Sequence, residues 1–205
     1  FHSLLGRGLS SDVNGQFPQN DGSIGQVPLN PDGKPKFQVY NTDSVWGTFW
    51  NLNQLWALVW PTYYNDFLQS QLVVYKNSNW LADGTANGRY VSGVGTNFVG
   101  LMIASGFQTG VIKDNLILAY EAALKNEIGY IDRKEGAGKI DLKGFVENGY
   151  VSYIPVEESN WRDSPEGSPF SVSHSLEYAY SSYAVAQMAY KLGKLEDYKL
   201  LMKLS

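Results

Sequence analysis

From Ser44 onward, hydrophobic residues recur at spacings of three and four, which is the pattern of helices that bury one face. The segment SVWGTFWNLNQLWALVW places Val45, Phe49, Leu52 and Trp56 on one stripe. Pro61 ends that segment and suits the first turn of a following helix. The following segment, PTYYNDFLQSQLVVYKN, has the same spacing at Tyr64, Phe67, Leu68, Gln71, Leu72 and Tyr75. Two helices joined at one proline predict a helical hairpin.

The next helical pattern, residues 95–107, is apolar on nearly every side, which is typical of a buried inner helix. KDNLILAYEAALKNE follows, with Asp114 or Asn115 available as the helix cap. DLKGFVEN predicts a short helix. SVSHSLEYAYSSYAVAQMAYKLG predicts the longest one, capped by Ser171 or Ser173 and ended by Gly193. A final helix starts near Leu195.

The remaining segments are rich in glycine, proline and asparagine. Residues 10–43 predict turns and short extended pieces, and residues 77–94 and 149–170 predict long connections. No convincing run of alternating strands occurs. The pattern therefore predicts about seven helices, and the fold class is all-α, built of helical hairpins with long loops. The small residues of the inner helix favour a toroid, and no 34- or 40-residue repeat supports an open solenoid.

The two ends of the chain read as parts of longer elements. FHSLLGRG resembles the last turns of a helix closed by glycine, and LEDYKLLMKLS is an amphipathic helix with nothing after it. We therefore expect the 205 residues to be a piece of a longer protein. We expect its exposed inner faces to associate with the remainder of its own polypeptide or with a second chain.

Composition narrows the function classes. The net charge of −4 lacks the basic excess of a nucleic-acid-binding surface, and zero cysteines exclude disulfides and thiolate metal sites. No apolar run is long enough to span a membrane. The chain holds 6 Trp, 14 Tyr and 9 Phe. Aromatic rings either form a core or stack on the apolar faces of sugars.

The candidate chemistry rests on few residues. Of the two histidines, His2 lies at the start of the chain, and His174 is expected to cap a helix or pack against a loop. Asp43 is most simply a helix cap. Glu177 is the best carboxylate candidate, because it lies among Leu176 and two tyrosines. We favour a structural ion pair for it, with work on a ligand as the alternative.

Four tryptophans are spaced by helical turns. Trp46 and Trp50 lie four residues apart, as do Trp56 and Trp60, so each pair would share a helix face. Asn51, Asn53 and Gln54 lie between them. One interpretation is core packing. The other is a stacking platform with amide donors and acceptors beside it.

Several blocks resemble, in order and almost end to end, the middle of the catalytic domain of glycoside hydrolase family 92. The blocks are FHSLLGRGLSSDVNGQF, NTDSVWGTFWNLNQLWALVWP, NSNWLADGTANG, LAYEAALKNE and VSHSLEYAYSSYAVAQMAYKLGKLEDY. The resemblance implies a calcium-dependent, exo-acting α-mannosidase that works with inversion. It further implies an (α/α)6 toroid preceded by a β-sandwich, in an exported protein of a glycan-degrading bacterium.

Residues 1–205 would then be a partial (α/α)6 catalytic domain without its β-sandwich and its C-terminal remainder. The resemblance places the general acid, the base carboxylates and the calcium-binding Asn-Glu pair C-terminal to Ser205. It therefore implies no catalytic residue and no metal ligand in this chain, and the chain alone is predicted to be inactive. Its substrate partner would be a glycan.

Charged positions of the family's motifs are neutral here. The family's Trp-Asp-Thr and the arginine that follows correspond to Trp46-Gly47-Thr48 and Trp50, and its His-Pro to Asn53-Gln54. Its Gly-Asp-His corresponds to Gly95-Thr96-Asn97, and its Asp-Asp after LEYAY to Ser181-Ser182. A non-hydrolytic carbohydrate-binding relative is therefore the alternative function. The residues predicted to line the sugar cleft are Trp46, Trp50, Asn53, Trp80, Arg89, Asn97 and Glu177.

Overall fold

A computed structural model describes residues 8–42, 45–91, 94–158 and 164–205 of the chain. The described residues contain seven α-helices, as the sequence predicts. They are α2 (Leu52–Val59), α3 (Pro61–Ser78), α4 (Phe98–Gln108), α5 (Leu116–Ile128), α6 (Leu142–Asn148), α7 (Ser171–Lys191) and α8 (Leu195–Lys203). Two 3₁₀ turns, η1 (Thr48–Trp50) and η2 (Val156–Glu158), add to them. The expected helix end at residues 1–7 and the cap at Asp43 lie outside the described residues.

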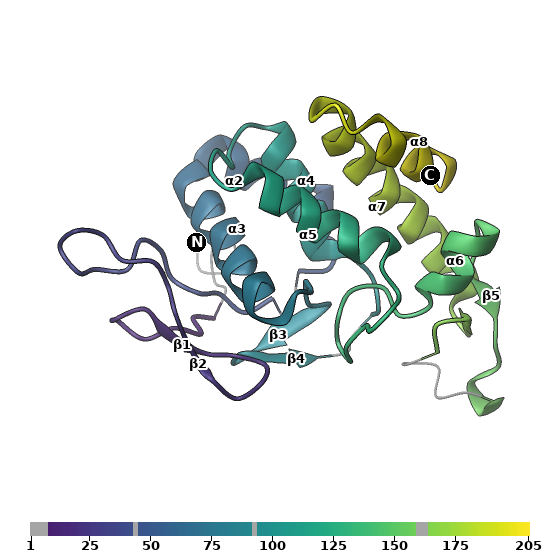
Figure 1. Ribbon diagram of the computed structural model, residues 1–205, viewed down its shortest axis with the longest axis horizontal. Coiled ribbons are helices and arrows are strands. Elements are labelled where there is room, and N and C mark those ends of the chain that lie inside the picture. Colours follow the sequence, from purple (N-terminus) through teal and green to yellow (C-terminus); the bar gives the residue numbers. More distant parts are fainter. Residues whose placement is uncertain (1–7, 43–44, 92–93, 159–163) are drawn as a thin grey trace.

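Consecutive helices pack as pairs, namely α2 with α3, α4 with α5, and α7 with α8 (Figure 1). Helix α4 lies at the centre of this arrangement, because it contacts α2, α3, α5 and α7. Most of its residues are buried, which confirms the predicted inner helix. The main core forms around it, from Trp56 of α2 through Phe67 and Leu72 of α3 to Val185 and Met188 of α7.

The proline-joined hairpin is confirmed. Pro61 occupies the first turn of α3, and the predicted stripe from Tyr64 to Tyr75 is buried. At the close approach of α3 and α4, a Cβ added to Gly106 would lie 2.2 Å from Leu68 Cδ1. Any larger residue at position 106 would therefore force the helices or the end of the Leu68 side chain to move.

The predicted helix over residues 44–60 is wrong in its first half. Gly47 has a left-handed backbone with φ of 67°, and only the 3₁₀ turn η1 follows before Asn51 interrupts the helical path. Trp46 precedes this turn, so Trp46 and Trp50 do not sit one turn apart on one helix. In the second pair, Trp56 belongs to α2 and Trp60 is its C-cap, whose amide donates to the Trp56 carbonyl. These two residues therefore lie one turn apart, as predicted, and both pack against the main core.

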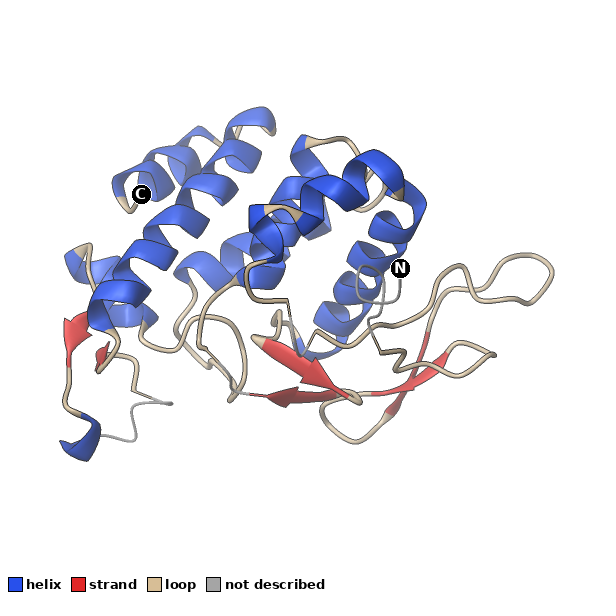
Figure 2. Cartoon of the chain, turned by 180° about the vertical axis from the view of Figure 1, so that it is seen from behind, coloured by secondary structure: helices blue, strands red, loops and turns tan. Residues whose placement is uncertain are grey.

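The described residues also contain three small two-stranded sheets, the first of which lies in the segment 10–43 where the sequence predicts short extended pieces. β1 (Gln16–Pro18) pairs antiparallel with β2 (Ile24–Gln26), and β3 (Gly84–Ala86) with β4 (Arg89–Val91). β5 (Ser152–Tyr153) pairs parallel with β6 (Gly167–Ser168). Strands of two or three residues are too short to show alternation in a sequence. Figure 2 shows β1–β4 gathered along one side of the helices.

The predicted N-cap position at Asn115 is confirmed, but neither α5 nor α7 has the side-chain cap that the sequence predicts. Asn115 occupies the N-cap of α5, but its side chain donates to Gln69 of α3 instead of capping a helix amide. Phe170 is the N-cap of α7, while Ser173 donates its hydroxyl to the Phe170 carbonyl. Gly193 follows α7 with φ of 70°, as the predicted stop requires. In the described part of the chain, no helix is both long and apolar enough to cross a membrane.

Candidate functional site

The seven predicted sugar-contacting residues differ widely in exposure. Trp46 and Trp50 are 55% and 77% exposed, Arg89 is exposed, and Glu177 is half-buried. Asn53, Trp80 and Asn97 are almost completely buried. A contact with sugar therefore stays a prediction for the exposed residues. For the three buried residues it has no support in this geometry, because their side chains offer no atoms to a ligand.

Trp50 lies on the outside of η1, where Gly47 makes room for it. A Cβ at Gly47 would sit 3.3 Å from the Trp50 ring. Behind it, the Phe49 ring meets Trp50 edge to face at 5.5 Å and stacks on Phe98 at 5.7 Å. Phe49 also contacts Tyr180 of α7. Trp50 is thus an exposed ring on an aromatic base, as a stacking platform requires.

Three of the predicted residues, Asn53, Trp80 and Arg89, lie in the core or on a different element from Trp50. Asn53 is buried on α2, and neither of its amide atoms has a hydrogen-bond partner in the described part of the chain. Trp80 lies under the ammonium group of Lys125, whose Nζ is 4.6 Å from the ring centroid. This is a cation–π contact rather than a sugar platform. Arg89 lies on β4, in the hairpin that follows Trp80.

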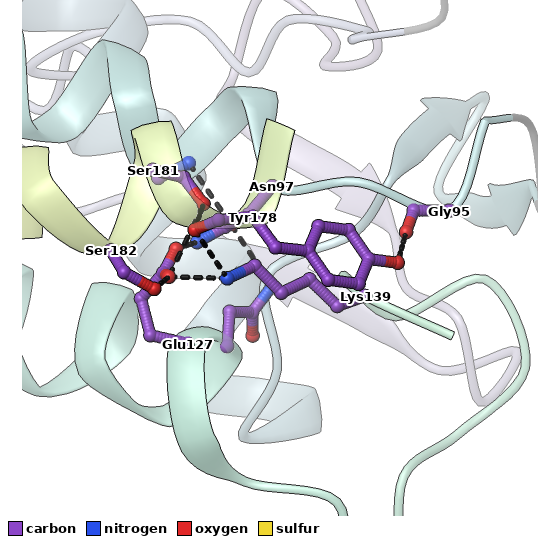
Figure 3. A network of polar contacts seen from close by, with 9 residues as sticks. Gly95, Asn97, Glu127, Lys139, Tyr178, Ser181 and Ser182 are labelled. Carbon is purple, nitrogen blue, oxygen red and sulfur yellow. Dashed lines mark hydrogen bonds and ion pairs between the residues drawn. The ribbon is translucent and has the colours of Figure 1, made fainter. Parts of the chain in front are cut away.

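Asn97 belongs to a buried polar network where α4, α5 and α7 meet (Figure 3). Its Oδ1 accepts from the Gly100 amide and caps α4, while its Nδ2 donates to Glu127 Oε1 at 2.6 Å. Glu127 forms an ion pair with Lys139, and neither side chain is exposed to solvent. Asn97 therefore positions the start of α4 instead of facing a ligand.

Two serines of α7 join the same network. Ser182 Oγ donates to Glu127 Oε2 at 2.8 Å, and Ser181 Oγ does so at 3.2 Å. The carboxylate that these hydroxyls contact thus comes from α5 instead of from α7. Glu127 and Lys139 were not predicted as functional residues from the sequence, because a charged residue near a helix end or in a glycine-rich loop is normally exposed.

Aromatic rings surround the buried lysine. Lys139 Nζ lies 4.7 Å from the Tyr178 ring centroid and 5.3 Å from that of Phe145. Burial lowers the pKa of Lys139, and the Glu127 carboxylate opposes that shift. Burial also raises the pKa of Tyr178 well above its usual value. The Tyr178 hydroxyl donates to the Gly95 carbonyl, which ties α7 to the segment before α4.

His174 packs against a loop, as the sequence predicts. Its Nδ1 is 2.8 Å from Asp141 Oδ2, and its ring stacks on Tyr178 at 5.4 Å. Asp141 immediately precedes α6, so the contact joins α6 to α7. Both side chains are buried, and a role for His174 toward a ligand has no support in this geometry.

Glu177 lies half-buried on α7, and the predicted structural ion pair is wrong. No lysine or arginine of the described residues pairs with it. Burial raises its pKa, and nearby His174 only partly opposes this shift. A half-buried carboxyl group with a raised pKa is the kind of group that glycosidases use as an acid. It is equally able to accept a hydrogen bond from a sugar hydroxyl.

Calcium has no fitting site among the described residues. No group of three or more aspartate, glutamate, histidine or cysteine side chains converges there, and calcium takes six to eight oxygen ligands. Of the three buried carboxylates of the described residues, Glu127 and Asp141 are engaged by a lysine and a histidine, and Asp83 accepts from the backbone amides of Gly95 and Thr96. We therefore derive no step through a metal from these residues.

The fold of this chain is similar to that of solved α-mannosidase structures. The chain matches, over 95% of its length, a family GH92 α-mannosidase from Bacteroides thetaiotaomicron in complex with mannoimidazole, with a TM-score of 0.74 and 26% identity. The same mannosidase without that ligand gives the same values. A family GH92 inverting mannosidase from Bacteroides thetaiotaomicron VPI-5482 shares the fold, with a TM-score of 0.67 and 20% identity over 93% of the chain.

The chain covers only 22%, 23% and 24% of those three structures, which is about a fifth to a quarter of their length. No curated protein matches it. The sequence model of the glycosyl hydrolase family 92 catalytic domain, however, matches residues 1–205. Because that match spans the whole chain, the protein belongs to glycosyl hydrolase family 92.

Proposed function

We propose that this chain is part of a glycoside hydrolase that cleaves α-mannosidic linkages of glycans. The family 92 match over all 205 residues carries the proposal. The α-mannosidase activity named for the structural relatives supports the choice of sugar. In this proposal the three helix pairs form part of an (α/α)6 toroid. The protein is exported and depends on calcium, which is bound outside the described residues.

Within this chain, the exposed residues contact the glycan. Trp46 and Trp50 present flat apolar rings, on which the apolar face of a sugar can stack. Glu177 supplies a carboxyl group without a competing cation, so it is available to a sugar hydroxyl. The buried network of Asn97, Glu127 and Lys139 holds the start of α4 against α7 and so fixes the distance between these contacts.

A specific observation favours a second candidate, a carbohydrate-binding relative that does not hydrolyse. Positions that carry charge in the family motif are neutral here. Asn97 and both serines turn inward to Glu127, so their polar groups are already satisfied. Charge-assisted hydrogen bonds to sugar, worth about 1.5–3 kcal/mol each, are therefore missing at these positions.

Hydrolysis of an aryl α-mannoside, with and without calcium, separates the two candidates. We expect no turnover by the 205-residue chain, because it holds no assigned acid–base pair, and calcium-dependent turnover by the complete polypeptide. A complete polypeptide that binds mannosides but never cleaves them would favour the second candidate.

Glu177 variants of the complete polypeptide define the role of that carboxyl group. If Glu177 binds a hydroxyl, Glu177→Gln keeps most activity and Glu177→Ala weakens binding. If it donates the proton, Glu177→Gln lowers kcat at least a hundredfold. Glu121→Gln, an exposed change on α5, is the matched control.

A further inference from the structure

A groove of about 200 Å³ lies between η1, α2, α4 and α7, beside Trp50 but separate from the residues already assigned to sugar contact. Its floor is the side of α4 at Ala104 and Ser105. Two kinds of side chain form its walls. They are the aromatic residues Phe49, Tyr180 and Tyr183 and the amides Gln54, Gln108 and Gln187.

The aromatic walls leave ring surface free. Tyr180 and Tyr183 are each 49% exposed. Phe49 holds Tyr180 in place at a centroid distance of 5.2 Å. The two tyrosine hydroxyl groups have no hydrogen-bond partner in the described part of the chain. The groove thus offers flat apolar surface together with two phenolic donors.

The three amides have unused hydrogen-bonding capacity. Gln54 Nε2 donates to the Phe49 carbonyl at 2.8 Å, which leaves its oxygen available. Gln108 Nε2 is buried without an acceptor, and the Gln187 amide nitrogen reaches only the sulfur of Met202 at 3.8 Å. No lining residue is charged. The groove therefore suits a neutral ligand with several hydroxyl groups.

The same features argue against an apolar helix as the occupant. A helix packed into the groove would bury these amide and phenol groups without partners, and each unsatisfied group costs about 1–3 kcal/mol. A polyhydroxylated ring can satisfy them while stacking on the aromatic walls. The groove is smaller than the roughly 300–1,000 Å³ of pockets that hold drug-sized ligands, so we expect it to take no more than one small ring.

We propose that this groove binds a single neutral hexose ring, as a subsite separate from Trp46, Trp50 and Glu177. The proposal rests on the proposed function, since it assumes that the protein handles glycans. In this subsite, Gln54 and Gln187 form hydrogen bonds with the sugar. Tyr180 and Tyr183 provide the rings on which it stacks, and the small residues of α4 leave room for it.

Titration of methyl α-D-mannopyranoside onto the 205-residue chain, followed by NMR, tests the subsite. We expect saturable chemical-shift changes in the NMR signals of Leu101 and Ala104. We expect no such changes with mannose 6-phosphate, because no cation lines the groove.

Replacing both amides with leucine, in Gln54→Leu/Gln187→Leu, should weaken binding about tenfold or more. Tyr183→Phe should weaken it severalfold. Gln16→Leu on β1 is the matched control and should change nothing.

Three results would overturn the subsite. The first is an absence of saturable binding, and the second is an unchanged affinity in the double variant. The third is a self-association in which a second copy of the chain covers the groove, and which the double variant abolishes.

The proposed function fails separately. If the complete polypeptide hydrolyses α-mannosides and the double variant has no effect, only the subsite is wrong. If the groove binds the probe but the complete polypeptide hydrolyses no α-mannoside, only the hydrolase is wrong.

Discussion

At the scale of single residues, a buried carboxylate and a buried lysine lie beside two neutral serines of α7. Ser181 and Ser182 are neutral, yet both donate to a carboxylate that Glu127 supplies from the neighbouring helix. Lys139 neutralises that carboxylate from a loop. A buried ion pair of this kind contributes little net stability, but removing one partner strands the other charge in the core.

We therefore expect Glu127→Gln to lower the free energy of unfolding by about 3–5 kcal/mol, because Lys139 would stay buried without its counter-ion. Urea denaturation measures the change. The double variant Glu127→Gln/Lys139→Met should lose less than the single one. Purely additive losses would show that the two side chains do not act as a pair. Lys199→Met, which removes an exposed pair with Glu196, is the control and should cost below about 1 kcal/mol.

The tryptophans divide into core and surface. Trp56 is completely buried among Tyr63, Tyr64 and Phe67, so Trp56→Ala should cost about 3–5 kcal/mol of unfolding free energy. Trp50 is mostly exposed, and Trp50→Ala should change stability by about 0.5 kcal/mol or less. Thermal or urea unfolding of both variants, with mannoside binding measured on each, checks this. A strongly destabilised Trp50→Ala protein would show that Trp50 is a core residue and not a platform.

At the scale of elements, the close crossing of α3 and α4 depends on Gly106. In an exposed helix Gly→Ala is favourable, but here the new methyl would meet Leu68 at 2.2 Å. We expect Gly106→Ala to lose about 1–3 kcal/mol, the usual cost of overpacking. Leu68→Val removes the Cδ1 atom, so it should recover part of that loss in the double variant. A stabilised Gly106→Ala protein would mean that the two helices separate easily.

At the scale of the whole molecule, an apolar patch is open at the N-terminal end of α7. Tyr150, Tyr153, Val172 and Leu176 surround a shallow depression there, and each is between 58% and 74% exposed. Patches of this kind mark contact surfaces. In the proposed toroid, further helices of the same polypeptide would cover it.

For the isolated chain, we expect this patch to cause self-association that depends on protein concentration. Val172→Lys/Leu176→Lys should shift the chain toward monomer in sedimentation velocity experiments. Ser173→Lys, on the same helix but outside the depression, should not. A wild-type chain that stays monomeric at tens of micromolar would contradict the expectation.

Local patterns were sufficient for much of the fold. Helices α3 to α8, the turn at Pro61, the burial of α4 and the stop at Gly193 all follow from periodicity and from the conformational limits of proline and glycine. These features depend on residues close together in the chain. The family motifs are also local, and they alone are enough to indicate family 92.

The tertiary structure alone decided which polar groups are buried and which partners they have. Glu127 and Lys139 are 12 residues apart, and Ser182 is 55 residues from Glu127, so no local pattern relates them. The groove likewise needs side chains from η1, α2, α4 and α7. The observed positions of Trp46 and Trp50 also differ from the predicted ones. Periodicity predicts a helix there, whereas the left-handed backbone of Gly47 begins a 3₁₀ turn. The sequence thus determined most of the helices and the family, whereas helix packing determined which side chains remain free to bind a ligand.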